Sequence, residues 1–252
     1  DQHLLFHSDL KQYAIKQDAA YQSGASSRVE TGYFARRLSQ NTQRRRFQFS
    51  SQQFRDTDLF SASSWQPSAY VQHTVTGLKS RLAFTYGARF ERLNLTGQNV
   101  WTPRASAAFS VLPNTKVTLA YGQYSQFPNH TQFFGEFGNP ALKAERAIHY
   151  TFEIEQLLND KTRIRVEAYD REDRNGVDSA DTEYRLVDGR IVGPPLGAAG
   201  KFQNNLRGYA RGVEIFIQRR SVNKLSGWIS YSYGVARYRD ASTNLTFYGD
   251  YD

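Results

Sequence analysis

The sequence contains no cysteine, no methionine and no long apolar run. Without cysteine, a disulfide scaffold and thiolate metal sites are excluded, which is compatible with passage through an oxidising compartment. No segment approaches the roughly 18 consecutive apolar residues that a membrane-spanning helix needs, so a helical membrane protein is excluded. The N-terminal residues lack a charged stretch followed by an apolar core, so we expect no signal peptide here, and we expect the chain to be part of a longer protein.

Aromatic residues and charges of both signs are abundant instead. The 252 residues include 17 Phe and 16 Tyr, although the mean hydropathy is only −0.64. The net charge of +8 would suggest nucleic-acid binding if the basic residues clustered, but 24 acidic residues are interspersed among 32 Lys and Arg. We therefore expect no nucleic-acid partner. We also expect the many rings to contact something other than the core of an ordinary soluble domain.

Alternation of apolar and polar residues, which is typical of β-strands, recurs in segments of about ten residues. From Arg81 to Arg92, one face carries Leu, Phe, Tyr and Ala, and the other carries Arg, Ala, Thr, Gly and Glu. The chain is therefore predicted to be all-β. The predicted strands are 9–22, 28–38, 68–76, 81–93, 103–111, 115–126, 147–157, 162–172, 206–219 and 225–239.

The predicted connections alternate between short and long ones. The short ones consist of good turn residues such as Gly, Asn, Asp, Ser and Pro, whereas the long ones are 39–67, 94–102, 127–146 and 173–205. The last loop is predicted to contain a hairpin of its own, Glu183–Val187 and Arg190–Val192 around Asp188 and Gly189. Such alternation indicates an antiparallel up-and-down sheet that is trimmed at one end and elaborated at the other.

The length of the predicted strands favours a bilayer-spanning barrel over a soluble β-sandwich. Strands in sandwiches usually have about 5–6 residues, whereas about 9–11 tilted residues cross the hydrocarbon of a bilayer. The Leu, Phe and Tyr face would then contact lipid, and the Arg, Glu, Thr and Gly face would line a wet lumen. The candidates for the aromatic girdles at the membrane interfaces are Tyr70, Phe90, Tyr124, Tyr150 and Tyr238.

Several local strings add a family resemblance to this pattern. Residues 101–109 read WTPRASAAF, residues 119–128 read LAYGQYSQFP, residues 138–146 read GNPALKAER, and residues 208–215 read GYARGVEI. The strings YVQ at 70–72 and YGARF at 86–90 precede them in the expected order. This series, over residues 68–239, resembles the β-barrel of TonB-dependent outer-membrane receptors.

The resemblance implies a bacterial outer-membrane location, short periplasmic turns and long extracellular loops. Family barrels have about 22 strands around a plugged lumen, so residues 1–252 are expected to be a partial barrel domain of about ten strands that lacks the plug and the final strands. The implied function is energised uptake of a ligand, of the siderophore, cobalamin, glycan or peptide class. The implied partners are lipid, lipopolysaccharide, the plug of the same full-length chain and, through the plug, a TonB-type energy-coupling protein. A passive porin and a soluble secreted β-sandwich binding module stay as alternatives.

Two sets of residues are predicted to contact partners inside and above the barrel. An exposed aromatic loop is costly unless it packs or binds something, so the loop at 127–140 is a candidate for ligand capture or for packing against other loops. Its candidate ligand-binding residues are Phe127, Asn129, His130, Phe133, Phe134, Phe137 and Asn139. By the resemblance, the residues that face the plug or the water-filled lumen are Arg81, Arg89, Glu153, Glu155, Arg163, Arg165 and Glu167.

The remaining candidate features are basic, acidic or histidine-containing. Arg44, Arg45 and Arg46 form the densest basic run, which is predicted either to be solvated or to contact lipopolysaccharide phosphates. The acidic residues near Asp170 alternate with arginines and are predicted to form an ion-pair ladder rather than a glycosidase pair. No histidine pair has convincing metal-site spacing, and no catalytic motif is present, so the chain is predicted to be neither an enzyme nor a binder of a metal or cofactor.

Overall fold

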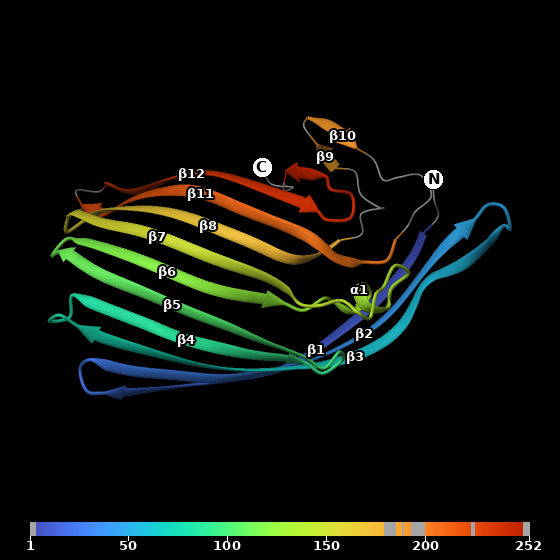
Figure 1. Cartoon of the computed structure of the whole chain (residues 1–252), viewed down its shortest axis with the longest axis horizontal. Helices are drawn as coiled ribbons and strands as arrows, with labels where there is room; N and C mark the ends of the chain where they lie inside the picture. The colour runs from blue at the N-terminus through green and yellow to red at the C-terminus, as the bar shows by residue number, and fades with distance from the viewer. Residues whose placement is uncertain (1–3, 179–184, 188, 193–199, 223–224, 249–252) are drawn as a thin grey trace.

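The computed structural model describes residues 4–178, 185–187, 189–192, 200–222 and 225–248. Eleven strands form one sheet, in which each strand pairs antiparallel with its neighbour along the chain (Figure 1). These strands are β1 (Leu4–Ser23), β2 (Ser27–Gln48), β3 (Gln53–Gly77), β4 (Leu82–Leu93), β5 (Gln98–Leu112), β6 (Thr115–Gln126), β7 (Glu145–Asn159), β8 (Thr162–Asp178), β11 (Gln203–Val222), β12 (Leu225–Asp240) and β13 (Thr246–Tyr248). The predicted up-and-down antiparallel sheet is confirmed, and each of the ten predicted strands coincides with one strand of it.

The pairing register places the apolar side chains of neighbouring strands on one face. One row of paired residues crosses eight strands and is apolar throughout: Val75, Phe84, Ala107, Leu119, Phe152, Ala168, Val213 and Tyr233. The adjacent row on the opposite face is small or polar: Thr74, Thr85, Ser106, Ala120, Thr151, Tyr169, Gly212 and Gly234. Because side chains alternate along every strand, the sheet has one apolar and one polar face.

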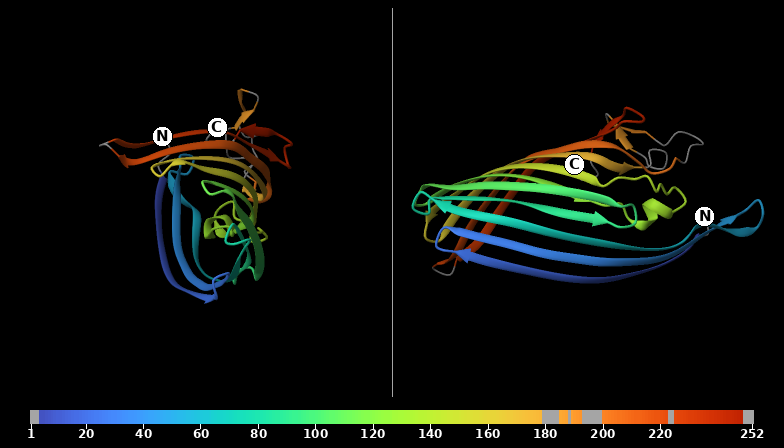
Figure 2. Two further views of the ribbon diagram at one scale, coloured as in Figure 1. Left: turned by 90° about the vertical axis from the view of Figure 1, so that its left-hand side faces the viewer. Right: turned by 60° about the horizontal axis from the view of Figure 1, so that its bottom comes forward.

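The sheet curves so that its polar face is concave, which we call the inner face; the apolar face is the outer face. Figure 2 shows the short helix α1 (His130–Phe134) within the concavity. This helix contacts the polar face, where His130 bonds to Ser64 of β3. Among the described residues no helix is long and apolar enough to cross a membrane. No second large sheet packs on this one in the described part of the chain, so the β-sandwich alternative is wrong.

Two of the predicted long loops are wrong. Residues 39–48 continue β2, and residues 53–67 begin β3, so only the turn at 49–52 separates these strands. This segment extends beyond the other strands at the end of the sheet that carries α1 (Figure 1). A strand that leaves the membrane has water on both faces, so the alternation that reveals the other strands is lost. Likewise, the predicted loop 94–102 is a turn at 94–97, after which β5 begins.

The hairpin predicted inside the last long loop is confirmed where it is described. The strands β9 (Arg185–Val187) and β10 (Arg190–Val192) pair antiparallel, and Gly189 has a φ of +75°. The predicted residues 183, 184 and 188 lie outside the described residues.

Three of the five predicted girdle aromatics are wrong. Phe90 and Tyr150 are on the outer face, but Tyr70, Tyr124 and Tyr238 are on the inner face, in the same rows as Arg89, Ala147 and Gly208. Their rings lie against glycine backbone, so a Cβ at Gly32, Gly122 or Gly208 would meet the ring of Tyr70, Tyr124 or Tyr238, respectively. A ring over a glycine covers backbone that has no side chain of its own, which accounts for tyrosines on a face that is otherwise polar.

Candidate functional site

The connection between β6 and β7 folds inward as a structured loop. Asn129 caps α1, because its side chain accepts a bond from the Gln132 backbone N–H and the Gln132 side chain accepts one from the Asn129 N–H, both 2.9 Å long. This reciprocal capping box satisfies two backbone donors at the start of the helix. At its end, the backbone N–H of Gly135 bonds to the carbonyl of Thr131.

A small apolar core holds this loop against the inner face. Phe133 and Leu142 from the loop and Leu93 from the end of β4 are each 2% exposed or less. Phe127 and Phe202 pack against them and are partly buried. Full burial of such side chains stabilises by roughly 1.5–3 kcal/mol each, so the aromatic residues of the loop serve packing to a large extent.

The NPALKAE string at 139–145 is held by side-chain amides from two distant strands. The Gln98 side chain of β5 donates to the Leu142 carbonyl (2.6 Å) and accepts from the Ala144 N–H (2.9 Å). The Asn204 side chain of β11 accepts from the Lys143 N–H (2.8 Å) and donates to its carbonyl (2.9 Å). Because each amide satisfies a donor and an acceptor of an irregular segment, this family-like string has a structural role.

The helix is tied to the long strands by polar contacts. His130 is 5% exposed, and its Nε2 lies 2.9 Å from the Ser64 hydroxyl. Burial lowers the pKa of His130 below its usual range. Asp58 of β3 is 2% exposed, accepts a bond from the Glu136 N–H and pairs with Arg44 at 3.3 Å. The ring of Phe134 lies 6.1 Å from that of Phe60.

The predicted ligand-binding residues thus come together in one loop, in different environments. Phe133 and His130 are buried, Phe127 is partly buried, and Asn139 donates to the Phe202 carbonyl at 2.8 Å. Asn129 and Phe134 remain exposed. Phe137 and Asn139 are partly buried. Ligand contact by this set stays a prediction, and Asn129 and Phe134 are its most accessible members.

A groove of ≈ 500 Å³ lies between this loop and the inner wall of β2, β3 and β4. Side-chain hydrogen bonds and an ion pair hold its polar lining in two groups. Arg36 Nε donates to the Gln66 side chain at 2.7 Å, and Arg89 donates to the Ser68 hydroxyl at 3.0 Å. Arg89 also pairs with Glu91 at 2.9 Å, and Glu91 accepts from the Ser125 hydroxyl at 2.7 Å. The other polar lining residues are Gln40, Arg92, Gln126, Asn129 and His130.

Four lining residues were predicted as site residues from the sequence: Arg89 as lumen-facing, and Phe127, Asn129 and His130 as ligand-binding. Arg36, Gln66, Glu91 and Arg92 were not. Glu91 alternates in phase with Arg89, so the period-2 pattern contained its signal. Arg36 and Gln66 pair across β2 and β3, but the predicted boundaries left Gln66 in a loop. Only the register brings these two residues to the same wall as Arg89.

The residues predicted to line the lumen are mostly engaged with one another. Glu155 lies 3.5 Å from both Lys116 and Arg163, and Glu153 lies 4.0 Å from Arg165. Glu167 is directly opposite Glu153 in the register. Arg81 is at the short-turn end instead, where it donates to the Ser110 and Val111 carbonyls. Contact of this set with a plug stays a prediction.

The basic run on β2 has carboxylate partners for two of its three members. Arg44 pairs with the buried Asp58, and Arg45 lies 3.2 Å from Asp56. Arg46 is directly opposite Arg55. The ion-pair ladder predicted near Asp170 is confirmed: Arg171 pairs with Asp173, Arg174 with Glu172 and Arg211 with Asp170, at 2.8–3.0 Å. Within the described ranges, no three side chains of the metal-ligating types come together.

The chain was compared with known protein sequences, solved structures and protein families. No curated protein sequence matches the chain. The chain is similar to the solved structures of the siderophore receptor PirA from Pseudomonas aeruginosa (TM-score 0.69, 15% identity, 92% of this chain and 42% of that one) and of the FrpB iron transporter from Neisseria meningitidis (0.70, 10%, 95% and 37%). It is also similar to the outer membrane transporter YddB from Escherichia coli (0.66, 10%, 92% and 34%).

The chain therefore spans well under half the length of these proteins, and at such identities the likeness shows the fold alone. The model of the family described as TonB dependent receptor-like, beta-barrel, matches residues 4–252, which is nearly the whole chain. This chain belongs to that family, and with it to the β-barrel receptors and transporters of the bacterial outer membrane.

Proposed function

We propose that the chain forms part of the barrel wall of a receptor that takes up its ligand by energised transport. The observation that carries the proposal is the pair of adjacent residue rows, one apolar and one small or polar, which run in register across eight strands. An apolar outer face fits hydrocarbon, and an inner face of Arg, Glu and Thr needs water or a polar protein domain against it. A plug domain of the full-length chain is the proposed partner of that inner face.

The positions of the charged residues suggest a separate role for each group. Arg89, Glu153, Glu155, Arg163, Arg165 and Glu167 would contact the plug or lumen water, and a TonB-type protein would act on the barrel's contents through the plug. Arg44, Arg45 and Arg46 are proposed to reach lipopolysaccharide. The loop at 127–144 and the groove below it would contact the ligand before the plug moves.

The charge of the groove favours an anionic ligand. Arg36, Arg89 and Arg92 line it together with only one carboxylate, that of Glu91. Arginine recognises carboxylate and phosphate groups through paired charge-assisted hydrogen bonds. Some relatives are named as siderophore or iron receptors, and an anionic metal chelate would suit this lining. The siderophore, cobalamin, glycan and peptide classes are all to be tested.

Uptake by the full-length receptor in cells tests the proposal. Labelled ferric siderophores, cobalamin, oligosaccharides and peptides are supplied with and without a protonophore. We expect one probe to accumulate only while the proton gradient is intact. Accumulation that is insensitive to the protonophore would support the passive porin instead and overturn energised uptake.

The groove is tested by a pair of matched variants. Arg36→Gln with Arg89→Gln should weaken binding of that probe about tenfold or more, because hydrogen bonds to charged groups contribute roughly 1.5–3 kcal/mol each. Arg37→Gln, at the next residue of β2 on the outer face, should leave binding unchanged. Equal binding by both variants would remove the groove from the proposal but not energised uptake.

A further inference from the structure

The outer face carries a row of arginines at its long-loop end. Arg146 of β7 is directly opposite Arg174 of β8, and Arg207 of β11 is directly opposite Arg239 of β12. Strands β8 and β11 are paired as well, and Arg207 falls at an irregular step of that register, across from Arg174. The four arginines thus follow one another across four adjacent strands, which are spaced about 4.8 Å apart.

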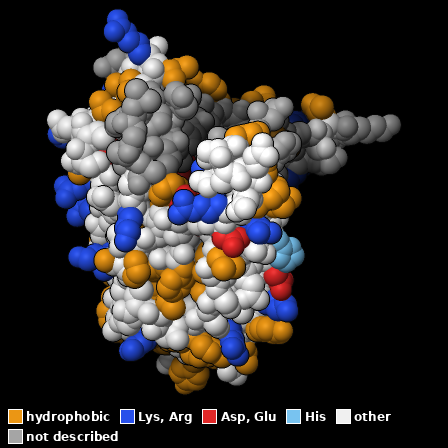
Figure 3. Space-filling model, turned by 90° about the vertical axis from the view of Figure 1, so that its right-hand side faces the viewer, with side chains coloured by type: hydrophobic (Ala, Val, Ile, Leu, Met, Phe, Trp, Pro, Cys, Tyr) orange, Lys and Arg blue, Asp and Glu red, His pale blue; other side chains and the backbone are white. Residues whose placement is uncertain are grey.

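Positive charge exceeds negative charge on the outer face around this row. Arg211 and Arg237 follow on the same face, so six arginines, here called the arginine patch, stand against the two carboxylates of Asp170 and Glu172. Figure 3 views the molecule from this end, where Lys and Arg side chains protrude around its rim. Like charges directly opposite each other destabilise a sheet, so the patch favours a bound anion.

Two members of the arginine patch are free to bind an anion. Arg174 pairs with Glu172, Arg211 with Asp170, Arg237 bonds to the Tyr248 hydroxyl and Arg239 bonds to the Asn244 side chain. Arg146 and Arg207 are exposed and have no side-chain partner in the described part of the chain. Guanidinium groups without a carboxylate are well suited to phosphate.

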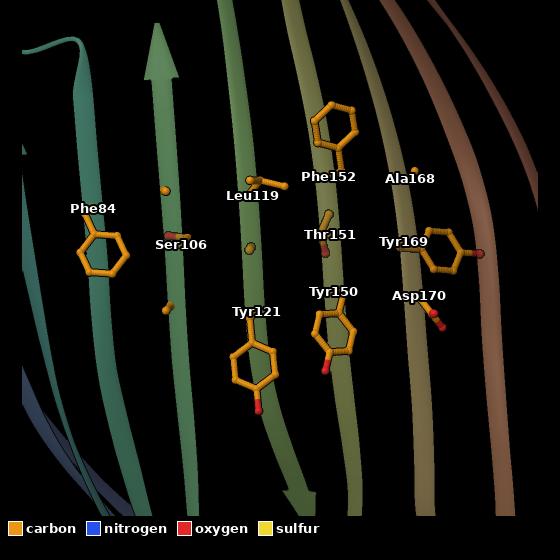
Figure 4. Close-up of a pocket in the computed structure, with 13 residues that line it drawn as sticks. Phe84, Ser106, Leu119, Tyr121, Tyr150, Thr151, Phe152, Ala168, Tyr169 and Asp170 are labelled. Carbon is orange, nitrogen blue, oxygen red and sulfur yellow. The ribbon is translucent and has the colours of Figure 1, made fainter.

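An apolar depression of ≈ 560 Å³ lies on the same face over β4 to β8, so it shares the strands β7 and β8 with the arginine patch. Ala105, Ala107 and Ala168 leave room between the larger side chains of Phe84, Leu119, Tyr121, Tyr150 and Phe152. In Figure 4 the hydroxyls of Tyr121 and Tyr150 point the same way along their strands, and Asp170 lies to one side of them, on β8, at the edge of the depression. Asp170 is the partner of Arg211, so this edge joins the depression to the patch.

We infer that the arginine patch and the depression together bind lipopolysaccharide, the phosphorylated glycolipid of the outer leaflet. Its phosphates would contact Arg146 and Arg207, and an acyl chain would lie in the depression. From Tyr150 to Arg146 is four residues of β7, or roughly 13 Å of strand at about 3.3 Å per residue. An amphiphile with phosphates above its acyl chains has this arrangement, whereas a soluble anion would use the patch alone.

This site is distinct from the basic run at Arg44–Arg46, in which the first two arginines already pair with Asp58 and Asp56. It rests on the outer-membrane location of the barrel and is independent of how the ligand is taken up. Failure of the uptake experiment would therefore not contradict lipopolysaccharide binding, and failure of lipopolysaccharide binding would not contradict energised uptake.

The experiment measures binding of purified lipopolysaccharide to the delipidated full-length receptor in detergent. The test variant is Arg146→Gln with Arg207→Gln. The control is Arg219→Gln with Arg220→Gln, an equal loss of charge at the short-turn end of β11, where both side chains are exposed. We expect the test variant to bind about tenfold or more weakly than the wild type, given the usual strength of arginine–phosphate hydrogen bonds, and the control to bind like the wild type.

Dephosphorylated lipopolysaccharide gives a readout that needs no variant. The wild-type receptor should bind the dephosphorylated form about tenfold or more weakly than the intact form. The test variant should bind both forms equally, because it already lacks the arginines that contact phosphate. Equal loss in the test and control variants would overturn the inference, as would an unchanged affinity for the dephosphorylated form. Binding of inorganic phosphate as tight as that of lipopolysaccharide would overturn it too, because phosphate has no acyl chain. Equally tight binding of phosphatidylglycerol vesicles would also overturn it, because the site would then recognise any anionic lipid.

Discussion

At the scale of single residues, contacts between tyrosine rings and glycines shape the inner face. Tyr238 lies across Gly208, to which it is paired between β11 and β12, and the hydroxyl of Tyr169 lies close to both Gly212 and Gly234. Alternation along one strand predicts the face of a residue but not its neighbour on the next strand. These contacts therefore required the register. The face of Tyr238 did not, because Tyr238 is out of phase with Tyr231 and Tyr233, and its assignment to the lipid-facing girdle ignored that alternation.

Gly208→Ala is predicted to destabilise the barrel, because the new methyl group would clash with the Tyr238 ring and the Arg237 carbonyl. Such overpacking costs about 1–3 kcal/mol. The free energy of unfolding of the full-length receptor in urea measures the effect. Gly227→Ala, at a strand position with nothing near the new carbon, is the control, and an equal loss of stability in both variants would contradict the packing role of the tyrosine.

His130 is predicted to make the inward-folded loop sensitive to acid. Its folded-state pKa is lowered by burial, so the unfolded loop binds a proton more readily than the folded one. Stability is therefore full above the ordinary pKa of about 6.5 and is lost as the pH falls below it. The protection factors of the amides of residues 127–144, which correct for the slower intrinsic exchange at low pH, should be smaller at pH 5 than at pH 7.5, whereas His130→Gln should show much less change. The same loss of protection in the variant would assign the effect to another group.

At the scale of elements, the sequence predicted strands wherever membrane and lumen face opposite sides of the sheet. Val117, Leu119 and Tyr121 alternate with Thr118 and Ala120, and β6 forms as predicted. The upper parts of β2 and β3 were missed because residues such as Gln40 to Arg46 are polar on both faces. The aromatic loop was predicted as a unit, but its inward fold depends on Gln98 and Asn204, which are 44 or more residues away from their partners in the loop.

The two faces of a strand are predicted to differ in their tolerance of charge. Phe84→Asp and Ile164→Asp should block assembly in the membrane, because a carboxylate facing hydrocarbon costs roughly 1–3 kcal/mol and hinders insertion. Thr85→Asp and Arg165→Asp should assemble, because their faces are wet. The heat-modifiable band of folded receptor in outer-membrane fractions measures assembly. Equal damage at all four positions would contradict the assignment of the faces.

At the scale of the whole molecule, the sheet formed by the described residues is open along both edges. Among these residues β1 pairs with β2 alone, and all of β1 except Asp9 is exposed. At the other edge, β13 covers only residues 237–239 of β12. A bilayer tolerates no open sheet edge, because unpaired backbone groups each cost several kcal/mol in hydrocarbon. The eleven strands therefore need further strands to close a barrel.

The isolated segment 4–252 is accordingly predicted not to form a stable barrel in lipid. Refolded into vesicles of outer-membrane lipids, it should stay sensitive to protease and should migrate identically on gels with and without heating, because both edges remain unpaired. The full-length receptor, treated in the same way, should become protease-resistant and heat-modifiable. A protease-resistant monomer of the segment would show that β1 and β12 can close on each other, and the barrel wall would then need no strands beyond those seen here.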